Sequence, residues 1–197
     1  EVAVLGHVCG RSAAEIGAWS LEDALWSSTT GWPETGAFLD NRLYLGSCHR
    51  FVGSKVGDYE NFSVGNLADD GLHYALDSDQ LQQIKWLVGQ QGLMIGSLSG
   101  EFQALGGDDN PITPDNIHVE GHTRFGSNGV PPVPIGNAIL FVTRSGRKLR
   151  ELVKSPGTPG LPLEGFVAPD LLLLARHLTE RGSDLASDPT IVDMAYQ

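Results

Sequence analysis

The chain has 197 residues, of which 41% are hydrophobic and 19% are charged, and this composition is typical of a globular protein with one ordinary domain or a modest pair. The formal net charge of −11 disfavours broad nonspecific binding to nucleic acid, because phosphate binding needs clustered Lys and Arg. No apolar run approaches the length of a membrane span, so we expect no transmembrane segment.

The first 30 residues are expected to be the end of a preceding β-unit, with short strands at Val2–Leu5 and Glu15–Trp19. Further along, Gly36–Leu45 contains two β-prone runs on either side of Asp40-Asn41. This pattern predicts a hairpin with a two-residue reversal. A strand and a turn are then expected over Gly53–Phe62.

The stretch Ser78–Leu105 reads as strand, turn, strand, turn and strand, and its pattern recurs on both sides. Leu93–Gly100 aligns with Ile139–Gly146 at an offset of 46 residues, and Leu43–Ser47 aligns with the start of the same motif at an offset of 50. A period of roughly 40 to 50 residues between four-stranded units is typical of β-propeller blades. We therefore expect a mainly β chain, with antiparallel meanders of propeller-blade type over residues 31–165.

The remaining residues, 166–197, are expected to form a short C-terminal helix and the start of another strand. A leucine-rich run from Leu171 to Thr179 follows Pro169 and predicts the helix. Ile191–Tyr196 is β-prone and predicts the strand. Upstream, His73–Leu76 and Ile117–Arg124 are expected strands, and Pro131–Pro134 a rigid connector.

Strand positions in two of the repeats predict the core residues. Alternation along the strands places Trp86, Leu93, Ile95 and Phe141 inward.

Two groups of residues could carry chemistry. On one strand face, His118, Glu120 and His122 would suit zinc, but the same alternation marks any solvated strand, and we favour that simpler explanation. The two cysteines, Cys9 and Cys48, are too few for a disulfide framework, which favours free thiols in a reducing cytoplasm over a bridge. We predict no catalytic, cofactor-binding or metal-binding residues.

An ordered series of motifs over residues 31–197 resembles the tail nozzle proteins of short-tailed bacteriophages, also called tail tubular or packaged-DNA stabilisation proteins. The motifs are, in chain order, Gly31-Trp32-Pro33, Arg42-Leu43-Tyr44-Leu45-Gly46, Val56-Gly57-Asp58-Tyr59, Trp86-Leu87-Val88, Ile112-Thr113-Pro114, Phe125-Gly126-Ser127, Leu140-Phe141-Val142, Gly146-Arg147-Lys148, Val167-Ala168-Pro169-Asp170-Leu171 and Ile191-Val192-Asp193-Met194-Ala195-Tyr196-Gln197. The segment Cys48–Gly53 departs from the family in being shorter and poorer in proline.

The resemblance implies a non-enzymatic structural protein of the virion tail, assembled in the host bacterial cytoplasm. It also implies a β-propeller-containing subunit and a homo-oligomeric ring, usually a hexamer, that closes and then conducts the DNA channel at the tail tip. The implied partners are the tail adaptor and tail fibre proteins, with DNA passing transiently and without specific binding. The chain would then be a central piece of a longer nozzle protein.

A tube that conducts DNA should not hold it, so we expect its channel surface to be acidic or neutral. The loop carboxylates expected to face the channel are Asp69, Asp70, Asp108 and Asp109. The basic residues expected elsewhere, paired with carboxylates or facing a neighbouring subunit, are Arg144, Arg147, Lys148 and Arg150. The simpler alternative is that the acidic loops only keep the protein soluble.

A second hypothesis is a carbohydrate- or receptor-binding β-module of a tail fibre. In that case Trp19, Trp26 and Trp32 would form a platform for stacking on sugars.

Overall fold

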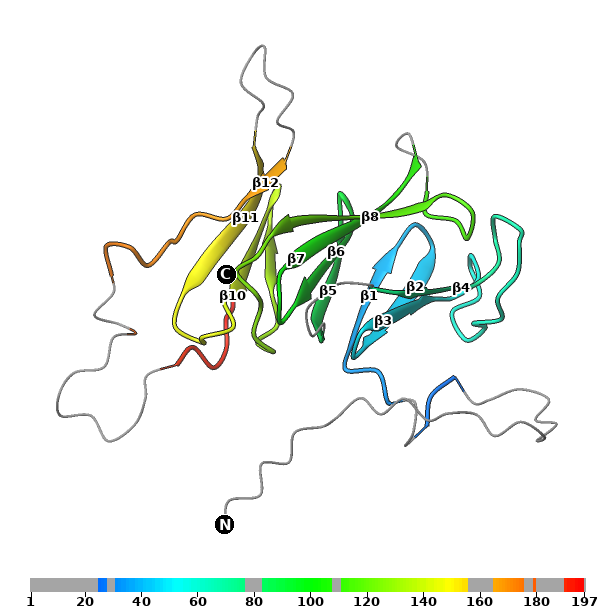
Figure 1. Ribbon diagram of the computed structural model, residues 1–197, viewed down its shortest axis with the longest axis horizontal. Coiled ribbons are helices and arrows are strands. Elements are labelled where there is room, and N and C mark those ends of the chain that lie inside the picture. Colours follow the sequence, from blue (N-terminus) through cyan, green and yellow to red (C-terminus); the bar gives the residue numbers. More distant parts are fainter. Residues whose placement is uncertain are drawn as a thin grey trace.

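A computed structural model describes residues 25–27, 31–76, 83–107, 111–155, 165–175, 179 and 190–196. Within these residues the chain is mainly β and forms three four-stranded antiparallel sheets, shown in Figure 1. The strands of the first sheet are β1 (Thr35–Leu39), β2 (Arg42–Ser47), β3 (Arg50–Gly53) and β4 (Leu72–Ala75). Those of the second are β5 (Ile84–Gln90), β6 (Gly92–Ser97), β7 (Glu101–Gly106) and β8 (Ile117–Thr123). Those of the third are β9 (Val133–Ile135), β10 (Ala138–Val142), β11 (Leu149–Ser155) and β12 (Gly165–Val167).

The expected hairpin at Asp40-Asn41 is confirmed as the β1–β2 turn. Leu39 pairs with Arg42, and the two residues between them have φ angles of 49° and 60°. Two consecutive positive φ values define a type I′ turn, whose twist matches that of the flanking strands. Asn and Asp tolerate this left-handed conformation better than other residues with side chains.

The repeated motif is the second strand of each sheet. The copies that begin at Leu43, Leu93 and Ile139 lie in β2, β6 and β10 respectively. Each of these strands is hydrogen-bonded to a strand on either side, and each consists mainly of apolar residues that favour strands. The sequence repeat therefore marks three copies of one four-stranded antiparallel unit.

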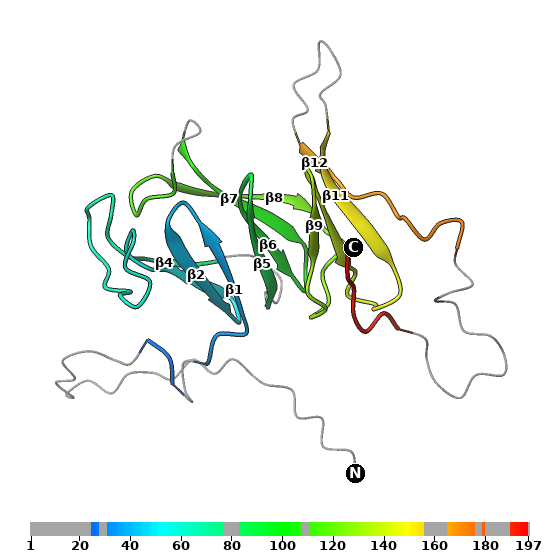
Figure 2. The same ribbon diagram turned by 180° about the vertical axis from the view of Figure 1, so that it is seen from behind.

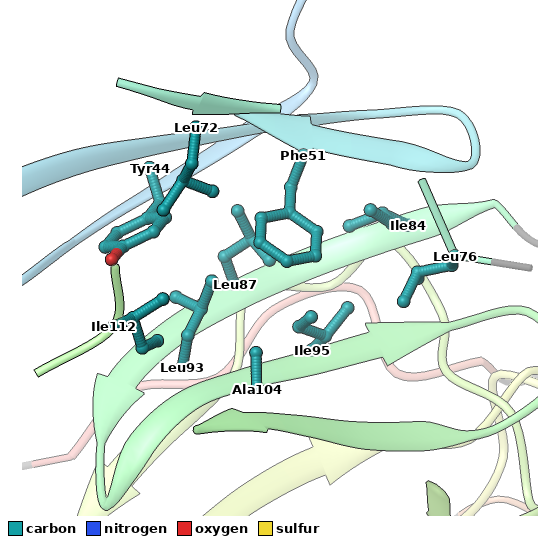
Figure 3. Close-up of a cluster of buried hydrophobic side chains, with 10 residues drawn as sticks. All are labelled: Tyr44, Phe51, Leu72, Leu76, Ile84, Leu87, Leu93, Ile95, Ala104 and Ile112. Carbon is teal, nitrogen blue, oxygen red and sulfur yellow. The ribbon is translucent and has the colours of Figure 1, made fainter. Parts of the chain in front are cut away.

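The three sheets pack face to face in a row, with the β5–β8 sheet in the middle (Figures 1 and 2). Side chains alternate along β6, so Leu93 and Ile95 face the first sheet while Met94 faces the third. Figure 3 shows the cluster between the first two sheets, in which Tyr44 and Phe51 meet the apolar face of β5 and β6.

A second cluster joins the middle sheet to the third sheet. Trp86 and Phe141 have ring centroids 5.9 Å apart, and both side chains are buried. Gly96 makes room for the indole, because a Cβ at this position would lie 2.0 Å from a Trp86 ring carbon. All four residues expected in the core, including Leu93 and Ile95, are buried.

Two segments differ from the expected elements. The strand expected over Gly53–Phe62 ends at Gly53, and residues 54–71 form a loop that contains turns and isolated bridges. The expected connector Pro131–Pro134 contains the start of β9, which pairs only with β10. Pro134 is compatible with this place because an edge strand leaves one row of amides unpaired.

The expected C-terminal helix is not shown. Leu171–Leu174 form turns, and the amide of Leu171 donates a hydrogen bond to the carbonyl of Leu149, which holds the chain beside β11. This backbone pairing competes with a helix, and leucine content alone does not encode it. The rest of the expected helix, apart from Ala175 and Thr179, lies outside the described residues, as do Val2–Leu5 and Glu15–Trp19. Ile191–Tyr196 is not a strand either, and the amide of Ile191 donates to Gly146 in the β10–β11 turn.

The expectation of free thiols is wrong for Cys48, which is disulfide-bonded. Cys48 lies in the β2–β3 turn at a φ of 50° and is 6% exposed. The spacing of cysteines in a sequence says little about their distance in space, which explains the error. Cys48 therefore no longer supports a reducing cytoplasm, since persistent disulfides are typical of oxidising surroundings.

No helix in the described part of the chain is long and apolar enough to cross a membrane.

Candidate functional site

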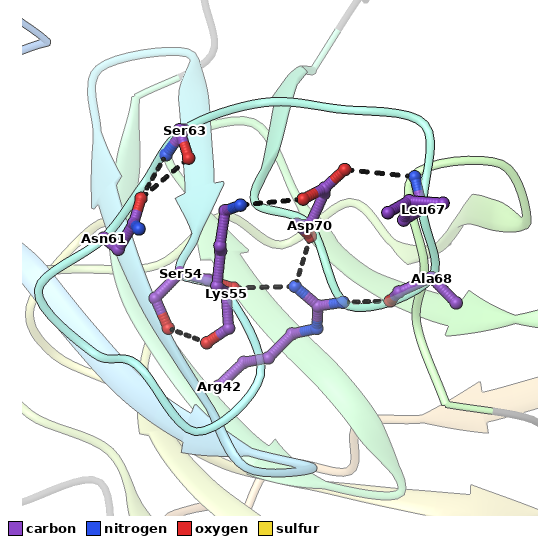
Figure 4. Close-up of polar contacts among 8 residues, drawn as sticks. All are labelled: Arg42, Ser54, Lys55, Asn61, Ser63, Leu67, Ala68 and Asp70. Carbon is purple, nitrogen blue, oxygen red and sulfur yellow. Dashed lines mark hydrogen bonds and ion pairs between the residues drawn. The ribbon is translucent and has the colours of Figure 1, made fainter.

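The loop between β3 and β4, residues 54–71, is held by the buried side chain of Arg42. Figure 4 shows its guanidinium donating hydrogen bonds to the carbonyls of Ser54, at 2.7 Å, and of Asp70, at 2.6 Å. It also donates to the carbonyl of Ala68. Arg42 is only 1% exposed, so these carbonyls take the place of the water that the guanidinium loses on burial. A single strand residue thus joins both ends of the loop to the first sheet.

The tip of this loop projects from the first sheet. All five residues from Val56 to Glu60 are exposed. Tyr59 packs edge-on against Phe38 of β1, with ring centroids 5.3 Å apart, and two carboxylates, Asp58 and Glu60, flank it. We call Val56–Glu60 the acidic tip.

The acidic tip is fixed by the backbone at its base. The amide of Gly57 donates to the carbonyl of Asn41 at 2.8 Å, and the amide of Val56 donates to the carbonyl of Asp69 at 3.0 Å. The tip is therefore ordered by its hydrogen bonds although its side chains face solvent.

The expected channel carboxylates have different surroundings. Asp69 is exposed, whereas Asp70 pairs with Lys55 at 2.9 Å and accepts a hydrogen bond from the amide of Leu67. The bond to Lys55 lowers the pKa of Asp70 and raises that of Lys55. Asp70 thus has a structural role in the loop, and Asp108 and Asp109 lie outside the described residues.

A basic cavity of about 290 Å³ lies at the third sheet, next to the β10–β11 turn. It is lined by Phe125, Thr143, Arg144, Ser145, Lys148 and Arg150. The guanidinium of Arg150 lies 3.5 Å from the centroid of the Phe125 ring, a cation–π contact, and donates to the carbonyl of Ala168. Lys148 lies 3.4 Å from Asp170, so one of the three cations has a carboxylate nearby. Three of the four basic residues that were expected to lie away from the channel, paired with carboxylates or facing a neighbouring subunit, therefore lie around one cavity.

A buried carboxyl group lies behind this cavity. Glu101 of β7 is 0% exposed and accepts hydrogen bonds from Ser127, at 2.9 Å, and from Thr123. Burial raises the pKa of Glu101, while these hydrogen bonds, one from the Phe125 amide and the charge of Arg150 act in the opposite direction. Glu101 thereby ties the middle sheet to the segment that supplies Phe125.

The pKa of Glu101 predicts a pH dependence of stability. Because the folded pKa lies above the ordinary value of 4.5, the unfolded chain releases this proton first as the pH rises. The contribution of this group is fully present below pH 4.5 and is lost as the pH rises through the folded pKa. Glu101→Gln, which cannot ionise, should therefore gain stability relative to wild type over this range. Urea unfolding from about pH 4 to 8 measures the difference, with the exposed Glu120→Gln as control. Parallel pH profiles for Glu101→Gln and wild type would contradict the expected shift.

The candidate metal ligands do not form a cluster. His118 contacts Glu120 at 3.1 Å, while His122 contacts Gln103 at 2.9 Å and its ring centroid lies 4.7 Å from that of Phe166. The described residues contain no group of three His, Cys, Asp or Glu side chains that could hold a metal ion.

The tryptophans proposed as a sugar platform are not seen together. Trp32 is 64% exposed, whereas Trp26 is half-buried beneath the guanidinium of Arg50, and Trp19 lies outside the described residues. A platform of the three is therefore not observed.

Sequence reasoning missed the roles of Arg42, Glu101 and Phe125. Arg42 and Glu101 each begin a strand next to a turn, where a charged residue is ordinarily exposed. A charge at the start of an otherwise apolar central strand is the signal that could have identified Arg42. Phe125 lies outside any strand and carried no periodic signal.

Comparison with known proteins does not extend these observations. No protein-family model matches the chain, and no curated protein is found to be similar to it.

Proposed function

We propose that this chain is a structural protein of a phage tail, a nozzle subunit that closes and conducts the DNA channel at the tail tip. The observation that carries the proposal is the row of three four-stranded antiparallel units packed face to face. Units of this kind build β-propellers, in which each blade packs only on its neighbours. The motif series that resembles tail nozzle proteins supports the same assignment. In this proposal the three sheets are consecutive blades of a propeller.

The outer face of the third sheet supports continuation of the row. Leu140, Val153 and Val167 lie on the face turned away from the middle sheet, and Val167 is 46% exposed. An apolar sheet face of this kind needs a covering layer. A further blade of the longer nozzle protein would supply one.

The proposed protein acts as a homo-oligomeric ring in the virion tail, a hexamer by resemblance. Its neighbours would be the tail adaptor and the tail fibre proteins, and it would be assembled in the host bacterial cytoplasm. The charge of −11 supports passage of DNA without retention, because a chain with more carboxylates than cations offers little net attraction to phosphate. Exposed Asp69 is a candidate for the channel wall.

Negative-stain imaging of the purified protein tests the proposal. We expect ring-shaped particles with a central opening, because closed rings arise when a subunit presents two different complementary surfaces. Class averages should show rotational symmetry, with six subunits favoured. Particles that remain single and compact at every concentration used for imaging would contradict the assignment.

A further inference from the structure

The two ends of the row of sheets carry opposite charge. The acidic tip projects from the first sheet, the basic cavity lies at the third, and Figure 1 shows the middle sheet between these two sheets. At one end Asp58 and Glu60 are exposed, and at the other Arg144 and Lys148 are exposed. The intervening middle sheet keeps the tip of a molecule away from its own cavity.

Of the three cations around the cavity, Lys148 lies near Asp170 and Arg150 acts on the buried carboxyl group of Glu101, whereas Arg144 has no carboxylate partner among the described residues. No described carboxylate lies within 4 Å of Arg144 or Arg150, and Asp170 approaches only Lys148. Arg144 makes one long hydrogen bond, of 3.5 Å, to the carbonyl of Leu98. The hydroxyls of Thr143 and Ser145 lie beside these cations and add hydrogen-bond donors. An open cavity with this lining is suited to bind oxyanions.

The acidic tip is built to enter such a cavity with little loss of conformational freedom. Its backbone is already held by Asn41 and Asp69, and the loop behind it is held by Arg42. Binding by a preorganised segment costs less entropy than binding by a free one. Tyr59, between the two carboxylates, supplies an aromatic ring that can lie against Phe125, which is 43% exposed.

We propose that the basic cavity binds the acidic tip of a second copy of this chain, with Asp58 and Glu60 pairing with Arg144 and Lys148. Such a contact joins unlike surfaces and repeats from copy to copy, so it closes into a ring or extends as a filament. Only the closed form rests on the proposed function. The pairing itself rests on the charge and shape of the two ends.

Charge reversal and its rescue test the pairing. Sedimentation velocity at low salt should show self-association of the wild-type protein that weakens as salt is added. Arg144→Glu and, separately, Glu60→Lys should each raise the apparent dissociation constant about tenfold or more, because like charges then face each other. An equimolar mixture of the two variants should restore association, because the reversed cavity of Arg144→Glu can then meet the reversed tip of Glu60→Lys.

Matched variants keep the test interpretable. Lys154→Glu makes the same change of charge on β11, away from the cavity lining, and should associate like wild type. Lys148→Glu is a second probe of the cavity. Lys148 and Lys154 are both exposed, and thermal melting shows whether each variant is folded. Arg150 is left unchanged because it packs on Phe125 and Ala168.

Three results would overturn the proposal. The first is that the wild-type protein stays monomeric at low salt. The second is that Arg144→Glu and Lys148→Glu associate as strongly as the wild type. The third is that the wild type binds a DNA oligonucleotide tightly and these variants do not. Rings that persist in Arg144→Glu would overturn the pairing and leave the nozzle assignment standing. If the mixture of charge-reversed variants associates but the wild type forms no ring, the result would support the pairing and count against the nozzle assignment.

Discussion

Replacing Trp86 with alanine is expected to lower the free energy of unfolding by about 3 to 5 kcal/mol, the usual cost of truncating a large aromatic side chain in a core. Trp86 is 2% exposed and lies against Phe141 of the third sheet. Its removal leaves a void between two sheets, where Gly96 offers no side chain that could fill it. Denaturant unfolding of the purified variant measures the loss.

Trp32→Ala is the matched control for this experiment. Trp32 is 64% exposed, so the same truncation should change the stability by less than about 0.5 kcal/mol. A loss below about 1 kcal/mol for Trp86→Ala would mean that the second apolar cluster does not join the two sheets as described.

Arg42→Met is expected to cost about 3 kcal/mol, because it removes a charged donor from several carbonyls at once. Methionine is unbranched and apolar, so the variant mainly tests the hydrogen bonds. The carbonyls of Ser54, Ala68 and Asp70 would lose their partner, and the first of these bonds is buried. Urea unfolding measures the stability, and hydrogen exchange at the amides of Val56 and Gly57 should become faster as the loop loosens.

Lys55→Met is the control for the loop. It removes the surface ion pair with Asp70 and leaves the contacts of Arg42 in place, so a much smaller effect is expected. Equal losses for the two variants would show that the loop depends on its surface charges and not on the buried guanidinium.

The middle of the chain illustrates how well local pattern predicts a β fold. The β1–β2 turn was predictable because Asp40 and Asn41 suit a left-handed reversal, which depends only on neighbouring residues. The repeat that begins at Leu43, Leu93 and Ile139 was predictable because each copy is a short apolar run closed by turn residues, which are local properties. The nozzle assignment, which rests on the resemblance of the motif series, remains a prediction.

The ends of the chain show where the same method fails. The leucine-rich run after Pro169 has the composition of a helix, but the amide of Leu171 bonds to β11 instead. That competitor lies more than twenty residues away in the sequence, so no local window contains it. The disulfide bond of Cys48 was missed because it too depends on a partner outside any local window of the sequence.

The sequence by itself determined the mainly β class, the central strands of the three units and four residues of their core, since period-two alternation and turn residues are local properties. The edge strands β9 and β12 were not predicted. The tertiary structure alone decided the roles of the polar residues. Arg42 meets its loop, Glu101 meets Ser127, and Arg150 meets Phe125 only after the sheets have formed and packed. A charged side chain is stabilised by whichever partners the fold brings within about 4 Å, and that distance is not written in the order of the residues.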